Sequence, residues 1–403
     1  MPQRPAGPTS TSVIAAARRS ARPRRGALAA AAVLVALSPA ALVLAPAGVH
    51  AQAVHRSADH RFRVDTVVTG LEHPWGLAFL PGGDMLVTER SGRLRLVRDG
   101  RLLPRPIAGL PEIWVRGQGG LLDVALHPQF PRNLLVYVSY SKPGPNGATT
   151  AVLRGRFDGS RLNDVEEIFE AKAWRSNSHV HFGSRLAFDR EGYLFITVGD
   201  RGEMRAAQDP SNHQGTHLRL HDDGRVPRDN PFVGRSGFLP EIFAYGNRNP
   251  QGLAIHPRTG QPWSVEHGAR GGDEVNVVLP GRNYGWPVIT YGVNYNGTPI
   301  TDITEQPGLE QPLHYWVPSI ATSGMAFYTG NRFPKWQGDV FVGGLAGEQL
   351  AHLRFDGTRR TFAEVLLEKK VGRVRDVRSG PDGYLYLLVD SPSAPLLRLV
   401  PAD

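Results

Sequence analysis

One pattern of apolar and polar residues recurs along the chain: a short apolar strand, a turn built on Pro, Asp or Gly, and a second β-rich strand. The pattern begins six times, at Gly76, Asp123, Arg185, Gly252, Gly324 and Asp376. The starts lie 47, 62, 67, 72 and 52 residues apart, which suits a four-stranded blade with loops of uneven length. No segment sustains a helical period. The pattern therefore predicts an all-β protein, a six-bladed β-propeller of four-stranded antiparallel blades.

The two ends of the propeller are expected to meet in the last blade, with residues 62–68 forming a strand beside residues 396–400. Such a closed ring leaves only short sheet edges and creates a central channel. Residues 201–238 and 283–312 are long, polar and rich in Gly, Asn and Pro. We expect both to be loops over one face, where binding sites usually lie.

The first 51 residues predict a secretory signal peptide, which leaves residues 52–403 as the propeller domain. A basic region precedes an apolar run at residues 27–37, and small residues lead to a cleavage site after Ala51. This run is too short to span a bilayer, which needs roughly 20 residues. We expect a periplasmic or secreted protein without stable membrane insertion after cleavage. An uncleaved anchor is the alternative, and Arg24-Arg25 leaves twin-arginine export open.

Charge and cysteine content narrow the possible functions. The leader holds six arginines and no acidic residue, so its removal takes away six of the nine net positive charges. No dense basic stripe interleaved with aromatic residues remains, which argues against a nucleic-acid partner. The chain has no cysteine, which excludes disulfides, thioether-linked haem and thiolate-held iron–sulfur clusters.

Two histidines, His179 and His181, lie directly before the third repeat. In an extended segment their side chains would project to the same side. Three roles are open: half of a zinc site, a histidine bonded to the backbone, or a general base. Asp200 follows His181 by one β-hairpin and is placed to fix the tautomer of a catalytic histidine. A plain Asp-Arg-Gly turn is the alternative for Asp200.

Planar hydrogen-bonding side chains occupy equivalent positions before other repeats. Gln118 precedes the second repeat, Arg248 and Asn249 precede the fourth, and Arg373 and Arg375 precede the last. Each taken alone could be a solvated loop residue. Because inner strands converge on the axis, together they predict a cationic channel mouth suited to a small planar polyanion.

Residues 266–274 combine carboxylates with a Gly-rich turn, and residues 283–287 follow closely. Carboxylate and backbone carbonyl oxygens are the ligands that calcium prefers. A surface turn is an equally good interpretation of this segment from its composition.

In this order, these segments resemble the soluble quinoprotein aldose sugar dehydrogenases, which are related to soluble glucose dehydrogenase. The resemblance covers nearly the whole mature chain, from residue 73 to residue 376. It rests on motifs that fall in register at residues 117–122, 181–186, 199–200, 246–252, 283–287 and 373–376. It implies a six-bladed propeller that binds pyrroloquinoline quinone (PQQ) and calcium. The implied reaction oxidises the anomeric hydroxyl of an aldose to the lactone, with hydride transfer to PQQ and an external electron acceptor.

The resemblance also implies roles for individual residues. His181 matches the general base, Asp200 the carboxylate beside it, and Arg248 a group that stabilises charge on the quinone oxygen. The residues that match quinone contacts are Gln118, Arg248, Asn249, Arg373 and Arg375.

Calcium ligands and one departure follow from the same resemblance. The carbonyls of Gly268 and Ala269 match ligands of a calcium ion that touches the cofactor, and Glu274 with Tyr284 matches a second, structural calcium. Ala346 stands where the family has a cofactor-contacting lysine. The loss of that charge-assisted bond would cost about 1.5–3 kcal/mol of PQQ binding, unless another group compensates.

Two other functions compete with the dehydrogenase. A calcium-dependent lactonase or esterase would use metal-bound water and act without quinone. A non-catalytic sugar-binding propeller would bind calcium but reduce no dye. A monomer or a homodimer is expected in each case.

Overall fold

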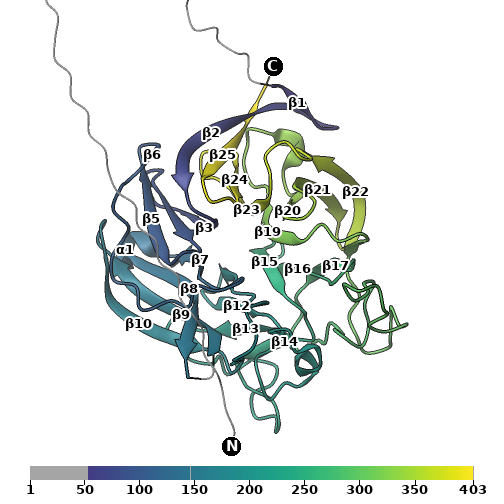
Figure 1. Cartoon of the computed structure of the whole chain (residues 1–403). Coiled ribbons are helices and arrows are strands. Elements are labelled where there is room, and N and C mark those ends of the chain that lie inside the picture. Colours follow the sequence, from purple (N-terminus) through teal and green to yellow (C-terminus); the bar gives the residue numbers. More distant parts are fainter. Residues whose placement is uncertain (1–52, 146, 403) are drawn as a thin grey trace, which may run out of the picture. The chain divides into compact units, whose positions relative to one another are not determined.

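Six antiparallel sheets surround a common axis in the computed structural model, which describes residues 53–145 and 147–402 (Figure 1). This arrangement confirms the predicted six-bladed propeller. The predicted signal peptide lies outside the described residues. None of the described helices is long and apolar enough to cross a bilayer.

In blades 1 to 5 the strands run outward from the axis in chain order. Blade 1 contains β3 (Pro74–Phe79), β4 (Met85–Glu89), β5 (Arg93–Arg98) and β6 (Arg101–Leu102). Blade 2 contains β7 (Leu121–Leu126), β8 (Leu135–Gly144), β9 (Gly147–Phe157) and β10 (Leu162–Glu170). Blade 3 contains β11 (Leu186–Phe188), β12 (Leu194–Val198), β13 (Thr216–Leu220) and β14 (Ile242–Tyr245).

Blades 4 and 5 repeat this order, whereas the two outer strands of blade 6 come from the start of the chain. Blade 4 contains β15 (Pro250–Ile255), β16 (Pro262–Glu266), β17 (Asp273–Val277) and β18 (His314–Trp316). Blade 5 contains β19 (Thr322–Phe327), β20 (Val340–Gly344), β21 (Gln349–Asp356) and β22 (Arg359–Leu366). Blade 6 contains β23 (Val374–Ser379), β24 (Leu385–Val389), β25 (Ala394–Pro401), β2 (Arg61–Leu71) and β1 (His55–Arg56). The short helices are α1 (Phe130–Asn133), η1 (Met204–Gln208) and η2 (Pro334–Trp336).

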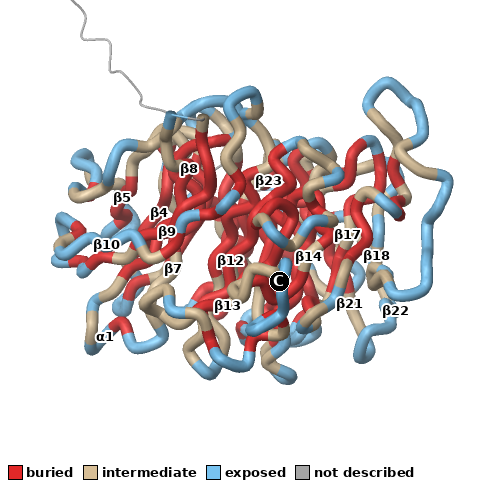
Figure 2. Tube along the Cα trace, turned by 90° about the horizontal axis from the view of Figure 1, so that it is seen from below, coloured by how far each residue is buried: buried red, intermediate tan, exposed pale blue. Residues whose placement is uncertain are grey.

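The six predicted repeats form the inner strands of the six blades. Each inner strand contacts the inner strand of the next blade, and β23 contacts β3, so the ring is closed. Glycine at two repeat starts permits this close approach, because a Cβ on Gly76 would lie 2.6 Å from Asp123 and one on Gly324 would overlap with Asp376. The buried part of the chain accordingly runs through the middle of the blades, with exposed loops at both ends (Figure 2).

The first and last strands close the ring as predicted. In the pairing of β2 with β25, Val64 lies opposite Leu399 and Val68 lies opposite Leu396. The two-residue strand β1 adds to the outside of this sheet, so blade 6 has five strands, one more than expected. The chain ends are thereby joined by backbone hydrogen bonds within one blade.

The expectation that residues 201–238 form only a loop is wrong. This segment contains β13, whose Leu218 and Leu220 are buried in the core of blade 3. Phe232, further along the segment, is buried in the same core. Two inward-pointing leucines are too few to stand out within a long polar segment, and the apolar pattern therefore missed the strand. Residues 283–312 contain no strand, as expected.

A buried ion-pair cluster fills the channel between the inner strands. Arg185 Nη1 lies 3.0 Å from Asp376 Oδ1 and 3.4 Å from Asp123 Oδ1, and all three side chains are at most 1% exposed. Arg378 approaches the same two carboxylates at 2.8 Å. The Arg185 guanidinium also lies over the Trp75 ring, 4.1 Å from its centroid. Charged groups from three inner strands or their immediate starts are thus held together on the axis, beside an aromatic ring from a fourth.

Candidate active site

The predicted site residues gather at the channel mouth where the inner strands begin. Gln118 precedes β7, His181 precedes β11, Asn249 immediately precedes β15 and Arg373 immediately precedes β23. The opposite mouth is lined by the distal parts of the inner strands, including Phe79, Leu126, Phe188 and Ile255. Because all inner strands run in the same direction, equivalent sequence positions meet at one end of the channel.

His181 and Asp200 form a direct pair, as the sequence predicts. The hairpin of β11 and β12 pairs Leu186 with Ile196, which brings the residues before β11 next to those after β12. His181 Nδ1 lies 2.6 Å from Asp200 Oδ1, with side chains that are 12% and 1% exposed. Asp200 accepts a hydrogen bond from the Nδ1–H group of His181, which places the proton of the neutral imidazole on Nδ1. Nε2 therefore carries a free lone pair. This is the tautomer that a general base requires.

The expectation that His179 and His181 lie on one side of an extended segment is wrong, because His181 has a φ of 55°. His179 instead packs edge-on against Trp114, with ring centroids 5.3 Å apart. The His181 backbone lies so close to the end of β12 that a Cβ on Gly199 would overlap with the His181 carbonyl oxygen. Among the described residues, no three His, Cys, Asp or Glu side chains group as a metal site would need, so the pair has no zinc ligand set.

Two side chains hold the His181 loop in place. Gln118 Oε1 accepts a 2.8 Å hydrogen bond from the His181 N–H. Arg201 is fully buried, lies 3.4 Å from the centroid of the Phe182 ring and donates to the Val180 carbonyl. The base is therefore fixed by blade 2 on one side and by the turn after β12 on the other.

The surroundings of this pair favour a neutral imidazole beside an ionised carboxylate. Burial lowers the pKa of His181, the Asp200 hydrogen bond opposes this, and the charges of Arg248 and Arg201 lower the pKa further. Burial tends to raise the pKa of Asp200, but its bond to His181 and the charge of Arg248 lower the pKa overall. At neutral pH, His181 is consequently ready to accept a proton.

A cationic recess lies at the centre of the same mouth. Its volume is about 160 Å³, and its lining residues are Trp75, Arg90, Gln118, Leu122, Phe182, Gln251, His267, Ala321, Leu345, Arg373, Arg375 and Asp390. Among these described residues, Asp390 is the only carboxylate, against three guanidinium groups. Burial lowers the pKa of Arg375 to about 10, Asp390 opposes this, and Arg185, Arg373 and Arg90 add to it. The recess therefore favours an anion, and its size suits the charged edge of a larger ligand.

The buried ion-pair cluster supports this recess from below. Arg185 donates through Nη2 to the Arg375 carbonyl at 3.1 Å and through Nε to the Gln251 carbonyl. Gln251 Oε1 in turn accepts a 2.8 Å hydrogen bond from Arg375 Nη1. The orientation of Arg375 thus depends on a residue deep in the channel.

Arg248 and Asn249 lie beside the base, outside the lining of the recess. The Arg248 guanidinium donates to the Gly268 carbonyl and lies 5.4 Å from the centroid of the Trp286 ring. Asn249 Oδ1 accepts from the Gly183 N–H at 3.1 Å. Asn249 Nδ2 is buried and has no partner among the described residues, so this amide has a donor available for a ligand.

Three of the four predicted calcium residues, Gly268, Glu274 and Tyr284, line a small cavity, and Ala269 does not. The cavity lining includes Arg248, Glu266, His267, Gly268, Glu274, Tyr284 and Thr290. Glu266 and Glu274 lie opposite each other on β16 and β17. Burial raises the pKa of both carboxyl groups, and the charge of Glu266 raises that of Glu274 further. A buried and a partly buried carboxylate beside carbonyl oxygens fit a divalent cation, which relieves the repulsion between the two carboxylates.

The contacts of Tyr284 and of the Gly-rich turn determine which oxygen atoms could bind a cation in this cavity. The Tyr284 hydroxyl donates to the Val277 carbonyl and accepts from the Leu279 N–H, so a ligand role falls to its backbone carbonyl. A Cβ on Gly268 would overlap with the Gly271 carbonyl oxygen, which explains the glycine at this turn. Ala269 is buried against the Trp286 side chain.

Ala346 lies at the rim of the cationic recess. It is exposed and follows Leu345, which lines the recess and whose carbonyl accepts a 3.3 Å hydrogen bond from Arg373. A longer cationic side chain at position 346 would start next to the recess, as the resemblance implies.

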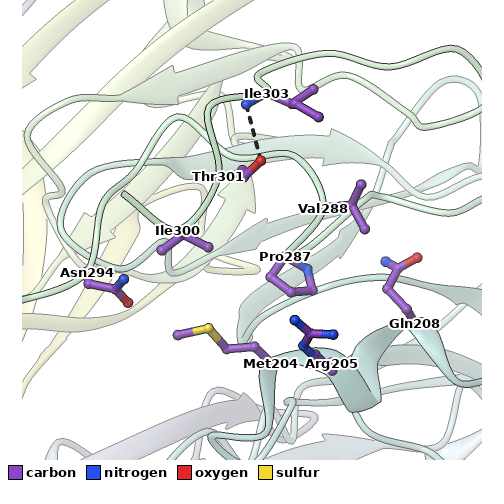
Figure 3. Close-up of a pocket in the computed structure, with 9 residues that line it drawn as sticks. All are labelled: Met204, Arg205, Gln208, Pro287, Val288, Asn294, Ile300, Thr301 and Ile303. Atoms are coloured by element: carbon purple, nitrogen blue, oxygen red, sulfur yellow. Dashed lines mark hydrogen bonds between the residues drawn. The ribbon is translucent and has the colours of Figure 1, made fainter. Parts of the chain in front are cut away.

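A larger cavity, of about 590 Å³, lies between η1 and the loop that follows Trp286 (Figure 3). Its lining is mainly apolar, with Met204, Pro287, Val288, Ile300 and Ile303 beside Arg205, Gln208, Asn294 and Thr301. Of these described lining residues, only Arg205 is charged. The volume of this cavity therefore favours it as a binding site. The titratable groups and planar donors, however, lie at the channel mouth. Because catalysis needs such groups, we assign the active site to the channel mouth.

Sequence reasoning missed several residues of the site, namely Trp75, Arg90, Gln251, His267 and Trp286. Trp75 and Gln251 lie at the starts of β3 and β15, the same repeat position that identified Gln118 and Arg375. That position was a usable signal for both. Arg90 and Trp286 lie in loops, and no local pattern indicates their contacts.

The sequence and the fold of this chain are both similar to those of known proteins. The family model described as glucose/sorbosone dehydrogenase matches residues 71–398. Aldose sugar dehydrogenase YliI of Escherichia coli (strain K12) is 44% identical over 346 residues, which cover 84% of this chain and 93% of that protein. The apo crystal structure of the E. coli soluble aldose sugar dehydrogenase superposes with a TM-score of 0.82 at 44% identity, covering 85% of this chain and 100% of that one. A PQQ-bound aldose sugar dehydrogenase from Streptomyces coelicolor has a TM-score of 0.70 at 29% identity, with 84% and 98% coverage.

Proposed function

Because the chain belongs to the glucose/sorbosone dehydrogenase family, we propose that it is a calcium-assisted, PQQ-dependent aldose sugar dehydrogenase. It oxidises the anomeric hydroxyl of an aldose to the lactone and passes the electrons to an external acceptor. The observation that carries this proposal is the His181–Asp200 pair beside a recess with three guanidinium groups. The PQQ-bound relative supports the choice of cofactor.

The residues of the channel mouth suit PQQ, whose three carboxylates need cationic and planar donors. Arg373 and Arg375 supply guanidinium groups in the recess, and Gln118 lines the same recess. Asn249 adds a buried amide donor beside the base. Bound PQQ would supply a two-electron acceptor for the hydride of the sugar carbon.

Calcium fits the adjoining cavity. The carbonyls of Gly268 and Ala269 would hold the ion near the cofactor, and Glu274 with the Tyr284 carbonyl would hold the second ion. Glu274 is the strongest argument, because its partly buried carboxylate faces buried Glu266, and neither β16 nor β17 contains a Lys or Arg that could neutralise the pair. Oxygen ligands of this kind, including backbone carbonyls, are typical of calcium sites.

The chain's own residues perform the proton transfer. His181 Nε2 accepts the proton of the anomeric hydroxyl, and ionised Asp200 stabilises the imidazolium that forms. Such general-base assistance contributes about 10²–10⁴-fold to the rate. Arg248 is placed to stabilise negative charge that develops nearby, and its fixed contact with the Gly268 turn keeps it oriented.

The export prediction completes the proposal: the protein works in the periplasm or outside the cell, without a nucleic-acid partner, as a monomer or homodimer. An enzyme outside the cytoplasm needs an electron acceptor in the same compartment, and the reduced cofactor would pass its electrons to that acceptor.

Reconstitution tests this function directly. The purified protein is mixed with PQQ and calcium, and the bleaching of an artificial dye is followed after addition of single aldoses. We expect bleaching that requires the sugar, PQQ and calcium together. Lactone or ester hydrolysis without PQQ would identify a hydrolase, and calcium binding without bleaching would identify a sugar-binding module. Either result would overturn the proposal.

A further inference from the structure

Trp286 contacts the catalytic pair from a loop that lies far away in the sequence. Its side chain is buried, and its Nε1–H donates to Asp200 Oδ2 at 2.8 Å. The other carboxylate oxygen, Oδ1, receives His181 Nδ1 at 2.6 Å and the Gly202 N–H at 2.8 Å. Both oxygens of Asp200 therefore have fixed donors on different segments.

We propose that Trp286 is a positioning residue for His181, acting through Asp200. By holding Oδ2, the indole N–H prevents rotation of the carboxylate and keeps Oδ1 aligned with Nδ1. This inference rests on the proposed function, because it assumes that His181 is the base. It adds a residue for which neither the repeats nor the resemblance indicates a role.

Trp286 is itself held in place by contacts on several sides. Its backbone N–H donates to the Gly246 carbonyl at 2.8 Å, and its carbonyl accepts from Gln208 Nε2 at 2.7 Å. Met204 and Ile300 pack against the apolar cluster of Ala207, Ala269 and Trp286, and both also line the 590 Å³ cavity (Figure 3). Trp286 is thus fixed by its backbone hydrogen bonds and by apolar neighbours, and such a rigid placement is what a positioning residue requires.

The hydrogen bond also sets the charge that Asp200 presents to the imidazole. Arg248 and Arg201 face both members of the pair, and His267 faces His181. The indole is a neutral donor that shares the negative charge of Asp200. Without it, more of this charge stabilises the imidazolium, and the pKa of His181 rises.

The test compares the dependence of kcat/KM on pH in the wild type and in Trp286→Phe, each loaded with PQQ and calcium. We expect the plateau to fall about tenfold, the size of one lost hydrogen bond to a charged group. The acidic limb should move to higher pH, which a purely structural loss would not cause. Trp336→Phe is the matched control, because Trp336 is fully buried and its Nε1 has no partner among the described residues. Its profile should keep its shape and position.

A second variant separates the N–H from the shape of the ring. Incorporation of benzothienylalanine at position 286 replaces the N–H by sulfur, and it should reproduce the shifted limb of Trp286→Phe even if the phenyl variant folds poorly. In an Asp200→Asn background, loss of the indole N–H should change the rate less than about twofold, since the two residues act as one unit.

An unshifted limb in the benzothienylalanine variant, or a full tenfold loss in the Asp200→Asn background, would overturn the role of Trp286. A wild-type protein that binds PQQ but reduces no dye would instead refute the proposed function, before any variant is compared.

Discussion

Replacement of Arg185 by methionine tests how the channel core supports the site. Arg185 is 1% exposed and lies 3.0 Å from Asp376 and 3.4 Å from Asp123. In the variant, Arg378 remains as the guanidinium that pairs with both buried carboxylates. Loss of one partner from a buried ion pair costs about 3–5 kcal/mol, because the remaining charge stays desolvated. We therefore expect the free energy of unfolding to fall by about this amount.

Urea unfolding of the purified protein, followed by tryptophan fluorescence, measures this loss. Arg398→Met is the control, because Arg398 is 32% exposed and its 3.5 Å contact with Asp65 is a surface pair worth less than about 1 kcal/mol. Arg185→Met should also weaken PQQ binding, since Arg375 loses the hydrogen bond at its carbonyl. A loss no larger than that of Arg398→Met would refute the view that the cluster stabilises the ring.

Three further predictions concern the cofactor, the metal and the base. Arg375→Gln should weaken PQQ binding about 10–100-fold and Ala346→Lys should strengthen it about tenfold, as the energy of a charge-assisted hydrogen bond implies; equal dissociation constants in a fluorescence titration would contradict this. Calcium should raise the melting temperature of the protein, and Glu274→Gln should lose most of that rise; a full rise in the variant would remove Glu274 from the site. The acidic limb of kcat/KM should lie below pH 6.5, because burial lowers the pKa of His181 and the base is lost only as pH falls through that lowered value; a limb above pH 6.5 would refute the assignment.

The fold could be predicted from the sequence because each blade repeats one local pattern. The inner strands begin with recognisable apolar segments, and the matching strand residues at the two chain ends indicated how the ring closes. The strand β13 was missed because its two buried leucines lie within a polar segment. Short elements of this kind are fixed by the neighbouring strands rather than by their own composition.

The site could be predicted where local geometry determines it. His181 and Asp200 flank one hairpin, so the pairing of β11 with β12 brings them together. The contact of Trp286 with Asp200 spans 86 residues, and the position of Arg185 between Asp123 and Asp376 depends on three different blades. Such contacts arise from the ring as a whole, and no spacing in the sequence contains them.

Reduction of bound PQQ in a single turnover tests the central claim most directly. The protein is loaded with PQQ and calcium, an aldose is added without any electron acceptor, and the cofactor spectrum is followed in the wild type and in His181→Gln. We expect stoichiometric reduction in the wild type, and in the variant unchanged PQQ affinity with reduction slowed at least about 100-fold. Reduction of PQQ by His181→Gln at the wild-type rate would show that the imidazole at the channel mouth is not the base.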